Sequence, residues 1–187
     1  MLQRAVVMVL EAVYEQDFKD CSYGFRPGRS AHQALETLWQ QTMATGGGWL
    51  VETYNRKFVD AIGRGLLREL LKRRVRDGML LRPIGKWLNA GMLEDGCVTH
   101  PDAGSPQGGV VSPMLSNVFL HDVLDEWFER DVQPSLQGHS FLIRSADDFL
   151  MGFTCEEDVR RVMEVLPKRF EKYGLTIHSV YCRAAKV

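Results

Sequence analysis

The chain carries, at residues 140–153, the sequence Ser-Phe-Leu-Ile-Arg-Ser-Ala-Asp-Asp-Phe-Leu-Met-Gly-Phe. Two short apolar runs flank a polar centre, which predicts a β-hairpin with Asp147 and Asp148 at its turn. Adjacent carboxylates repel each other unless a cation or water shields them. Apolar strands would hold the pair rigidly at a sheet end, which suits Mg²⁺, an ion bound by one or two carboxylates together with substrate phosphates. The alternative is a polar turn without a function, which often contains two adjacent aspartates.

Hydrophobic periodicity predicts helices and strands on both sides of this hairpin. The expected helices are 3–14, 30–46, 65–77 and 79–90, a long helix that begins at 112, and a last helix over 154–174. The expected strands are 49–53, 140–144, 149–153, 175–178 and 181–184. Strands and helices do not alternate regularly in this order. It therefore indicates an α+β fold, in which an antiparallel sheet carries helices on one face.

Local signals mark the ends of several helices. Ser30 with Gln33, and Thr154 with Glu157, have the spacing of a capping box. Ser112 is expected to cap the long helix, because the proline that follows suits a first helical position. Pro167 should kink or split the last helix.

The composition excludes several classes of protein. The 187 residues are 45% apolar, and 23 Lys and Arg nearly balance 24 Asp and Glu. A disordered chain and a protein that is basic throughout are therefore excluded, although a local basic face is not. The four cysteines form no Cys-x-x-Cys pair, which disfavours a zinc site or a disulfide framework. No apolar run approaches the ~20 residues of a membrane span and no signal-peptide pattern is present, so we expect a cytoplasmic protein.

One helix face is locally basic. Residues 64–86 hold eight basic residues and only two acids, Glu69 and Asp77. Arg64, Arg68 and Lys72 recur every four residues, and Arg73 lies beside them. This stripe is either a surface that contacts phosphates or an ordinary solvated helix face.

A second basic feature is the loop before residue 30. Arg26 and Arg29 flank Pro27-Gly28 just ahead of a helix N-terminus, where arginines can pair with phosphates. The alternative is a helix-entry turn with solvated arginines. The four tryptophans occupy apolar positions and are expected in the core rather than as platforms for stacked bases: Trp39, Trp49, Trp87 and Trp127.

Taken together, the motifs resemble those of bacterial group II intron reverse transcriptases, also called maturases. Four blocks carry the resemblance, in the family's order: Tyr23 to Ser30, Trp49 to Asp60, the Ser-Pro-Gln-Gly-Gly-Val-Val-Ser-Pro run at 105–113, and Arg144 to Phe153. Gly-Leu-Thr-Ile-His at 174–178 matches the start of the next motif. The spacing between the Ser-Pro-Gln-Gly-Gly block and Asp147-Asp148 makes the match specific.

The resemblance implies a right-hand polymerase palm with partial fingers. Residues 49–61 and 106–187 would be palm, and residues 1–48 and 62–105 would be fingers. The thumb and any endonuclease module are expected to be absent, so that 1–187 is a single reverse transcriptase domain fragment. Asp147 and Asp148 would hold catalytic Mg²⁺, and the expected partners are RNA and primer DNA. The residues implied to bind nucleotide or template are Arg26, Arg29, Val59, Gln107, Gly108 and Ser145.

The chain departs from the family at the chemistry. Tyr54 stands where the family has its first metal-binding aspartate, and a phenol, with an ordinary pKa of about 10, is a poor Mg²⁺ ligand at pH 7. Glu52 lies two residues earlier, roughly 6–7 Å along the strand, and Asp60 matches a non-catalytic aspartate. Three further positions also differ: Val59 replaces an aromatic that excludes the ribose 2′-hydroxyl, Ser145 a tyrosine, and Tyr181 a lysine expected to donate a proton.

The resemblance therefore predicts the reverse transcriptase domain of a group II intron-type protein, an RNA-directed DNA polymerase by class, that is inactive or severely impaired. The first alternative is a non-enzymatic RNA-binding remnant that assists intron splicing through the basic face at 64–86. The second is a structural fragment whose thumb is supplied by a partner chain. No membrane partner is expected.

Overall fold

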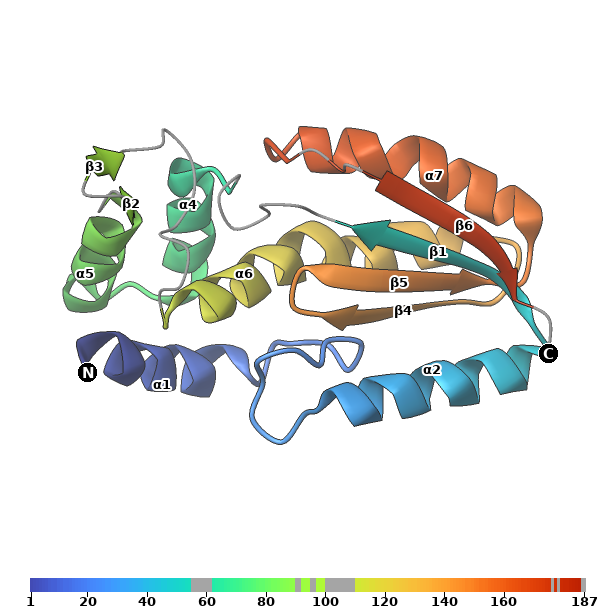
Figure 1. The fold of residues 1–187 in the computed structure, drawn as a ribbon, viewed down its shortest axis with the longest axis horizontal. Helices are drawn as coiled ribbons and strands as arrows, with labels where there is room; N and C mark the ends of the chain where they lie inside the picture. The colour runs from blue at the N-terminus through green and yellow to red at the C-terminus, as the bar shows by residue number, and fades with distance from the viewer. Residues whose placement is uncertain are drawn as a thin grey trace.

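Four antiparallel strands form the centre of the fold, in the order β4-β5-β1-β6 (Figure 1). The computed structural model of the chain describes residues 1–54, 62–89, 92–94, 97–99, 110–175, 177 and 179–185. Its strands are β1 Gly48–Tyr54, β2 Met92–Glu94, β3 Cys97–Thr99, β4 Ser140–Ser145, β5 Asp148–Phe153 and β6 Ser179–Ala185. Its α-helices are α1 Leu2–Tyr14, α2 Ala31–Thr45, α4 Arg64–Arg74, α5 Gly78–Asn89, α6 Ser112–Leu120 and α7 Glu156–Glu171.

The predicted hairpin is confirmed. β4 and β5 pair antiparallel up to Ser145 opposite Asp148, so that Ala146 and Asp147 make the turn, and Asp148, predicted at the turn, is the first residue of β5. β1 lies on the other side of β5, with Thr53 opposite Phe149, and it pairs with β6 through Tyr54 opposite Ser179. The strand predicted at 181–184 lies within β6, whereas Leu175 and Ile177, the described residues of the strand predicted at 175–178, lie outside any strand.

Helices cover both faces of the sheet, so the expectation of a single covered face was wrong. Alternation along β4 explains the difference, because Leu142 faces the main core. Phe141 and Ile143 face the opposite side and form a smaller cluster with Tyr23 of the preceding loop and Ala34 of α2. On the main face α7 packs on β1 and β5, and the Phe149 and Phe170 rings stack 5.8 Å apart. Successive residues of β4 are thus buried on opposite faces of the sheet.

The long helix begins as predicted, and its apolar side is buried. α6 continues into π-helical turns over His121–Asp125 and Phe128–Val132 and ends in a short 3₁₀ turn, Gln133–Ser135. Its cap position is Val111 rather than Ser112, which is the first helical residue. Trp127 is buried as expected, but Trp39 is 65% exposed, because α2 buries only Ala34.

Of the two predicted capping boxes, one forms and the other does not. The Ser30–Gln33 box forms, with the Ser30 N–H donating to Gln33 Oε1 at 2.8 Å and the Gln33 N–H to Ser30 Oγ at 3.3 Å. The Thr154 box does not, since the Thr154 hydroxyl donates instead to the His139 carbonyl, and Cys155 takes the cap position. α7 also runs unbroken past Pro167, held to the core by Val162, Leu166 and Phe170. Among the described residues, no helix has the length and apolarity to cross a membrane.

Candidate active site

The two carboxylates lie where the β4–β5 hairpin turns. Ala146, the first turn residue, has φ +59°, a left-handed conformation that few residues other than glycine adopt. Asp147 is half-buried and Asp148 is exposed at the start of β5. Partial burial, and then the neighbouring Asp147 carboxylate, raise the pKa of Asp148. The turn therefore concentrates negative charge that a cation would relieve.

Replacing Asp148 should reveal this repulsion as a pH-dependent stability. A raised folded pKa means that the Asp148 carboxyl favours the folded state at acid pH, and that this contribution is lost as the pH rises through the folded pKa. We therefore expect Asp148→Asn to raise the thermal unfolding midpoint slightly at pH 7 in EDTA. The difference should vanish near about pH 3, where the carboxyl is protonated in both states. Ser145→Asn, at the same hairpin end, is the control, and a lowered midpoint for Asp148→Asn at pH 7 would contradict the repulsion.

A fully buried arginine holds the turn from inside the molecule. The Arg144 guanidinium donates to both carboxylate oxygens of Asp125, at 2.9 and 2.7 Å, and neither side chain is exposed. Its Nη1 also donates to Asn117 Oδ1 at 2.8 Å and to the carbonyl of Ala146 at 2.9 Å. One side chain thus ties the helix α6 region to the residue that precedes Asp147.

The loop at residues 21–24 clamps the same turn from the other side. The Tyr23 N–H donates to the Arg144 carbonyl at 2.8 Å, and the Arg144 N–H donates to the Cys21 carbonyl at 2.7 Å. Asn117 Nδ2 donates to the Gly24 carbonyl at 2.8 Å. A Cβ on Gly24 would lie 2.3 Å from the Ala146 nitrogen, so only glycine fits here. The first motif block is therefore joined directly to the carboxylate turn.

The strand β1 brings residue 54 to the same end of the sheet. Its ladder with β5 ends at Thr53 opposite Phe149, and the next residue along, Tyr54, follows level with Asp148. Val51 and Thr53 are buried, and Glu52 alternates with them on the opposite face, across from Leu150. Within the described part of the chain, no three His, Cys, Asp or Glu side chains come together as a metal site. Within those residues Asp147 and Asp148 lack a third carboxylate, and two carboxylates alone do not complete a two-ion centre.

The structure gives the two predicted phosphate-binding arginines internal partners. The buried Arg26 guanidinium pairs with Glu15 at 2.7 Å and donates to the carbonyls of Lys19 and Ser22. Arg29 pairs with Asp20 and lies over the Tyr23 ring, with 28% of its side chain exposed. Arg26 therefore fastens the loop, and of the two only Arg29 presents surface to a ligand. Val59, Asp60, Gln107 and Gly108 lie outside the described residues.

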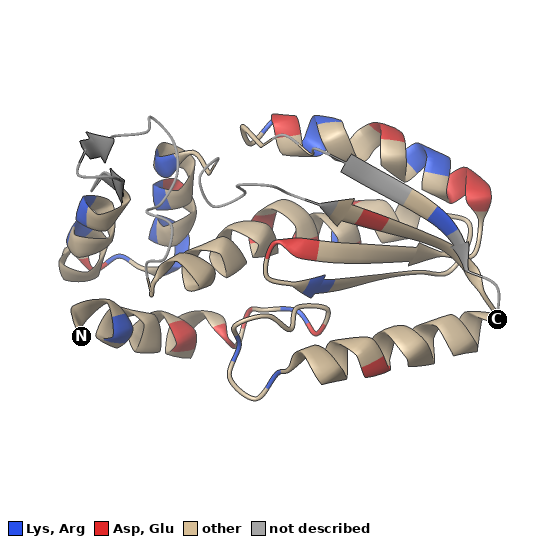
Figure 2. Ribbon diagram, viewed as in Figure 1, with Lys and Arg blue, Asp and Glu red and all other residues tan. Residues whose placement is uncertain are grey.

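The basic stripe lies on α4, away from the sheet (Figure 2). Leu67, Leu70 and Leu71 bury its opposite face. Arg68 is exposed, whereas Lys72 pairs with Glu69 and Arg73 with Asp122, each at 2.7 Å. Exposed pairs of this kind contribute about 0–1 kcal/mol, so both cations can exchange their partners for phosphates.

Sequence reasoning missed the Arg144–Asp125–Asn117 network. One signal for it was present, because Arg144 interrupts an apolar strand and Asp125 lies on the apolar side of the long helix. A charge at a buried position needs a partner of opposite charge. The sequence pattern therefore allowed the pairing of Arg144 with Asp125 to be predicted, but it gave no sign of the contacts with Asn117 and with the 21–24 loop.

Comparison with known proteins gives consistent matches. The family model described as "Reverse transcriptase (RNA-dependent DNA polymerase)" matches residues 1–186. The chain is 37% identical over 125 residues to protein YkfC of Escherichia coli, covering 65% of the chain and 33% of the relative. It is 38% identical over 123 residues to the group II intron-encoded protein LtrA of Lactococcus lactis, covering 66% of the chain and 20% of the relative. The chain thus spans about a third or less of the length of these relatives.

Two solved telomerase structures share this fold. The chain superposes on apo telomerase of Candida tropicalis with a TM-score of 0.72 at 11% identity, over 99% of this chain and 40% of the other. A Candida albicans telomerase in complex with a fragment of telomeric RNA gives a TM-score of 0.69 at 14% identity, over 97% and 33% of the two chains. At such low identity the likeness concerns the fold alone.

Proposed function

The chain belongs to the reverse transcriptase family, as a reverse transcriptase domain of group II intron-type proteins, and from this premise we propose that it binds RNA but does not polymerise DNA. The observation that carries the proposal is the residue at the end of β1. A tyrosine stands level with Asp148, at the position where the family resemblance implies the first metal-binding aspartate. The family implies a divalent metal in general, and we propose that Asp147 and Asp148 bind Mg²⁺ weakly or not at all. Primer extension and RNA gel shift test the two halves separately.

We further propose that the sheet-bearing segments 49–61 and 106–187 act as the palm and that 1–48 and 62–105 act as fingers. Figure 1 supports the assignment of α4, α5 and the β2–β3 hairpin to the fingers, because these elements lie together at one end of the molecule, beyond the end of the sheet. RNA template and primer DNA are the partners proposed for the palm, and a thumb would come from elsewhere in the full protein or from a partner chain. The relatives from E. coli and L. lactis are bacterial, and we propose a bacterial cytoplasmic setting.

RNA binding by the basic stripe should be weak, independent of sequence and sensitive to salt. We expect the triple variant Arg68→Glu, Lys72→Glu, Arg73→Glu to abolish the shift of a single-stranded RNA, because each reversal replaces an attraction to phosphate with a repulsion. For the unmodified chain, the logarithm of the affinity should fall by roughly 0.7 per phosphate contact for each tenfold rise in salt.

A matched control reverses the same number of exposed charges on another helix. Arg160, Arg161 and Lys168 of α7 are exposed, and replacing all three with Glu changes the net charge equally. If this α7 variant loses RNA binding as completely as the α4 variant, net charge rather than the stripe governs binding. Circular dichroism should show both variants folded.

A further inference from the structure

Phe25 is an aromatic residue held in a costly position. Its φ of +55° is left-handed, which is rare for a bulky residue, and its side chain is 66% exposed. Hydrogen bonds fix the residues on both sides: Asn117 donates to the Gly24 carbonyl, and the guanidinium of the following residue, Arg26, is bonded to Glu15. The loop thus keeps the ring in place at the surface. Strained residues held in this way cluster at binding sites.

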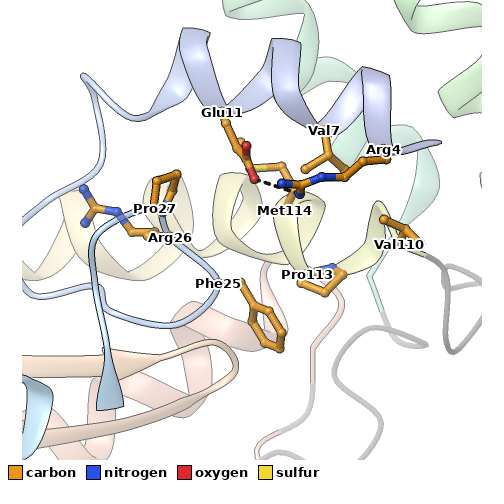
Figure 3. A pocket seen from close by; sticks show the side chains of 9 residues that line it. All are labelled: Arg4, Val7, Glu11, Phe25, Arg26, Pro27, Val110, Pro113 and Met114. Atoms are coloured by element: carbon orange, nitrogen blue, oxygen red, sulfur yellow. Dashed lines mark hydrogen bonds and ion pairs between the residues drawn. The ribbon is translucent and has the colours of Figure 1, made fainter. Parts of the chain in front are cut away.

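The ring borders a cavity of about 340 Å³ (Figure 3). Its apolar lining comes from α1, the 25–27 loop and the start of α6: Val7, Phe25, Pro27, Val110, Pro113 and Met114. The charged groups in the wall have partners, because Arg4 lies 3.4 Å from Glu11 and Arg26 is paired with Glu15. The apolar part of this lining suits a flat, uncharged ring.

Phe25, one of the residues that line the cavity, is next in the chain to a residue that contacts the carboxylate turn. Gly24 touches the backbone of Ala146 so closely that a Cβ would clash, and Phe25 is the next residue. The chain thus places an exposed aromatic ring one residue away from the contact with the turn that carries Asp147. Stacking on an aromatic ring is the usual way in which proteins bind unpaired bases without sequence preference.

We propose that Phe25 and this cavity bind an unpaired nucleobase of single-stranded RNA, by stacking of the base on the ring. This inference rests on the proposed RNA-binding function and names a site within it. The backbone phosphates are left to the cations outside the cavity, so that base and phosphate contacts are made by different residues.

The test measures the affinity of the unmodified chain and of three variants for a fluorescein-labelled RNA 12-mer of mixed sequence. Phe25→Leu keeps the Cβ and the apolar character but removes the ring, and should weaken binding roughly tenfold. Phe25→Trp keeps an aromatic ring at this position and should bind the RNA as tightly as the unmodified chain. Trp39→Leu is the matched control, because Trp39 is also an aromatic, 65% exposed, but lies on α2 away from the cavity. A DNA 12-mer of the same sequence shows whether the 2′-hydroxyl contributes.

The salt dependence separates this inference from the proposed function. Phe25→Leu should lower the affinity at every salt concentration without changing the slope, since no phosphate contact is lost. Equal affinities for Phe25→Leu and the unmodified chain would overturn the inference while RNA binding stands. If the unmodified chain shows no measurable affinity, RNA binding fails as a function, and photo-cross-linking at high concentration with 5-iodouridine RNA decides the site. A cross-link at Phe25 then supports the inferred base-binding site, and the absence of a cross-link there overturns this inference.

Discussion

Incubation of the chain with an RNA template, a DNA primer, deoxynucleoside triphosphates and Mg²⁺ is expected to give no detectable extended primer. Two-metal nucleotidyl transfer depends on ions held between the attacking and leaving oxygens. Asp147 and Asp148 supply two carboxylates, and the position beside them on β1 is a tyrosine. The metal that activates the primer hydroxyl is then poorly held. Losing several kcal/mol of this stabilisation slows the reaction by at least about a thousandfold.

Tyr54→Asp alone should not restore extension, because Ser145 and Tyr181 also replace residues that the family uses. We expect activity to return when Tyr54→Asp, Val59→Phe, Ser145→Tyr and Tyr181→Lys are combined in a chain joined to the thumb of an intron-encoded relative. The contradicting result is template-dependent extension by the unmodified chain that disappears with Asp147→Ala. That result would make Glu52 or Asp60 the third metal ligand.

The parts of the fold that follow from local patterns were predictable from the sequence. The apolar runs on both sides of Asp147-Asp148 gave the hairpin, and the spacing of Ser30 and Gln33 gave the start of α2. Each depends on residues only a few positions apart, where alternation and capping chemistry act directly. The same reasoning failed at Thr154, because its hydroxyl donates a hydrogen bond to a carbonyl 15 residues away instead.

The parts that depend on distant contacts were not predictable. Alternation shows that a strand has two faces, but not that α2 covers one of them and leaves Trp39 exposed. The loop at 21–24 touches a turn about 120 residues later in the chain, and no local pattern encodes that contact. The resemblance placed both segments near the active site, but the structure was needed to show that a buried arginine joins them.

Removing the Arg144 guanidinium should be among the most destabilising single changes in this protein. Arg144→Met leaves Asp125 as a buried carboxylate without its cation, and it also leaves Asn117 Oδ1 and the Ala146 carbonyl without a donor. Breaking one side of a buried ion pair costs about 3–5 kcal/mol. For a chain of this length we expect the thermal midpoint to fall by roughly 6–20 °C. Asp125→Ala should lower the free energy of unfolding by a similar amount, because it leaves the Arg144 guanidinium buried without its anion.

The double variant Arg144→Met, Asp125→Leu separates the cost of an unpaired charge from the value of the pair. Replacing a buried ion pair with apolar residues of similar size is often neutral, because desolvation offsets most of the attraction between the charges. The double variant should therefore be much more stable than the sum of the single changes predicts, as a thermodynamic cycle from urea unfolding would show. Full recovery would mean that the pair adds little net stability, whereas a remaining deficit would measure the hydrogen bonds to Asn117 and Ala146. Single variants that melt within a few degrees of the unmodified chain would contradict the burial of this pair. The double variant also lacks the hydrogen bond from Arg144 to the Ala146 carbonyl, so part of the lost stability should be confined to the hairpin turn. Arg144→Met, Asp125→Leu should therefore speed amide hydrogen exchange at residues 146–148 more than in α7.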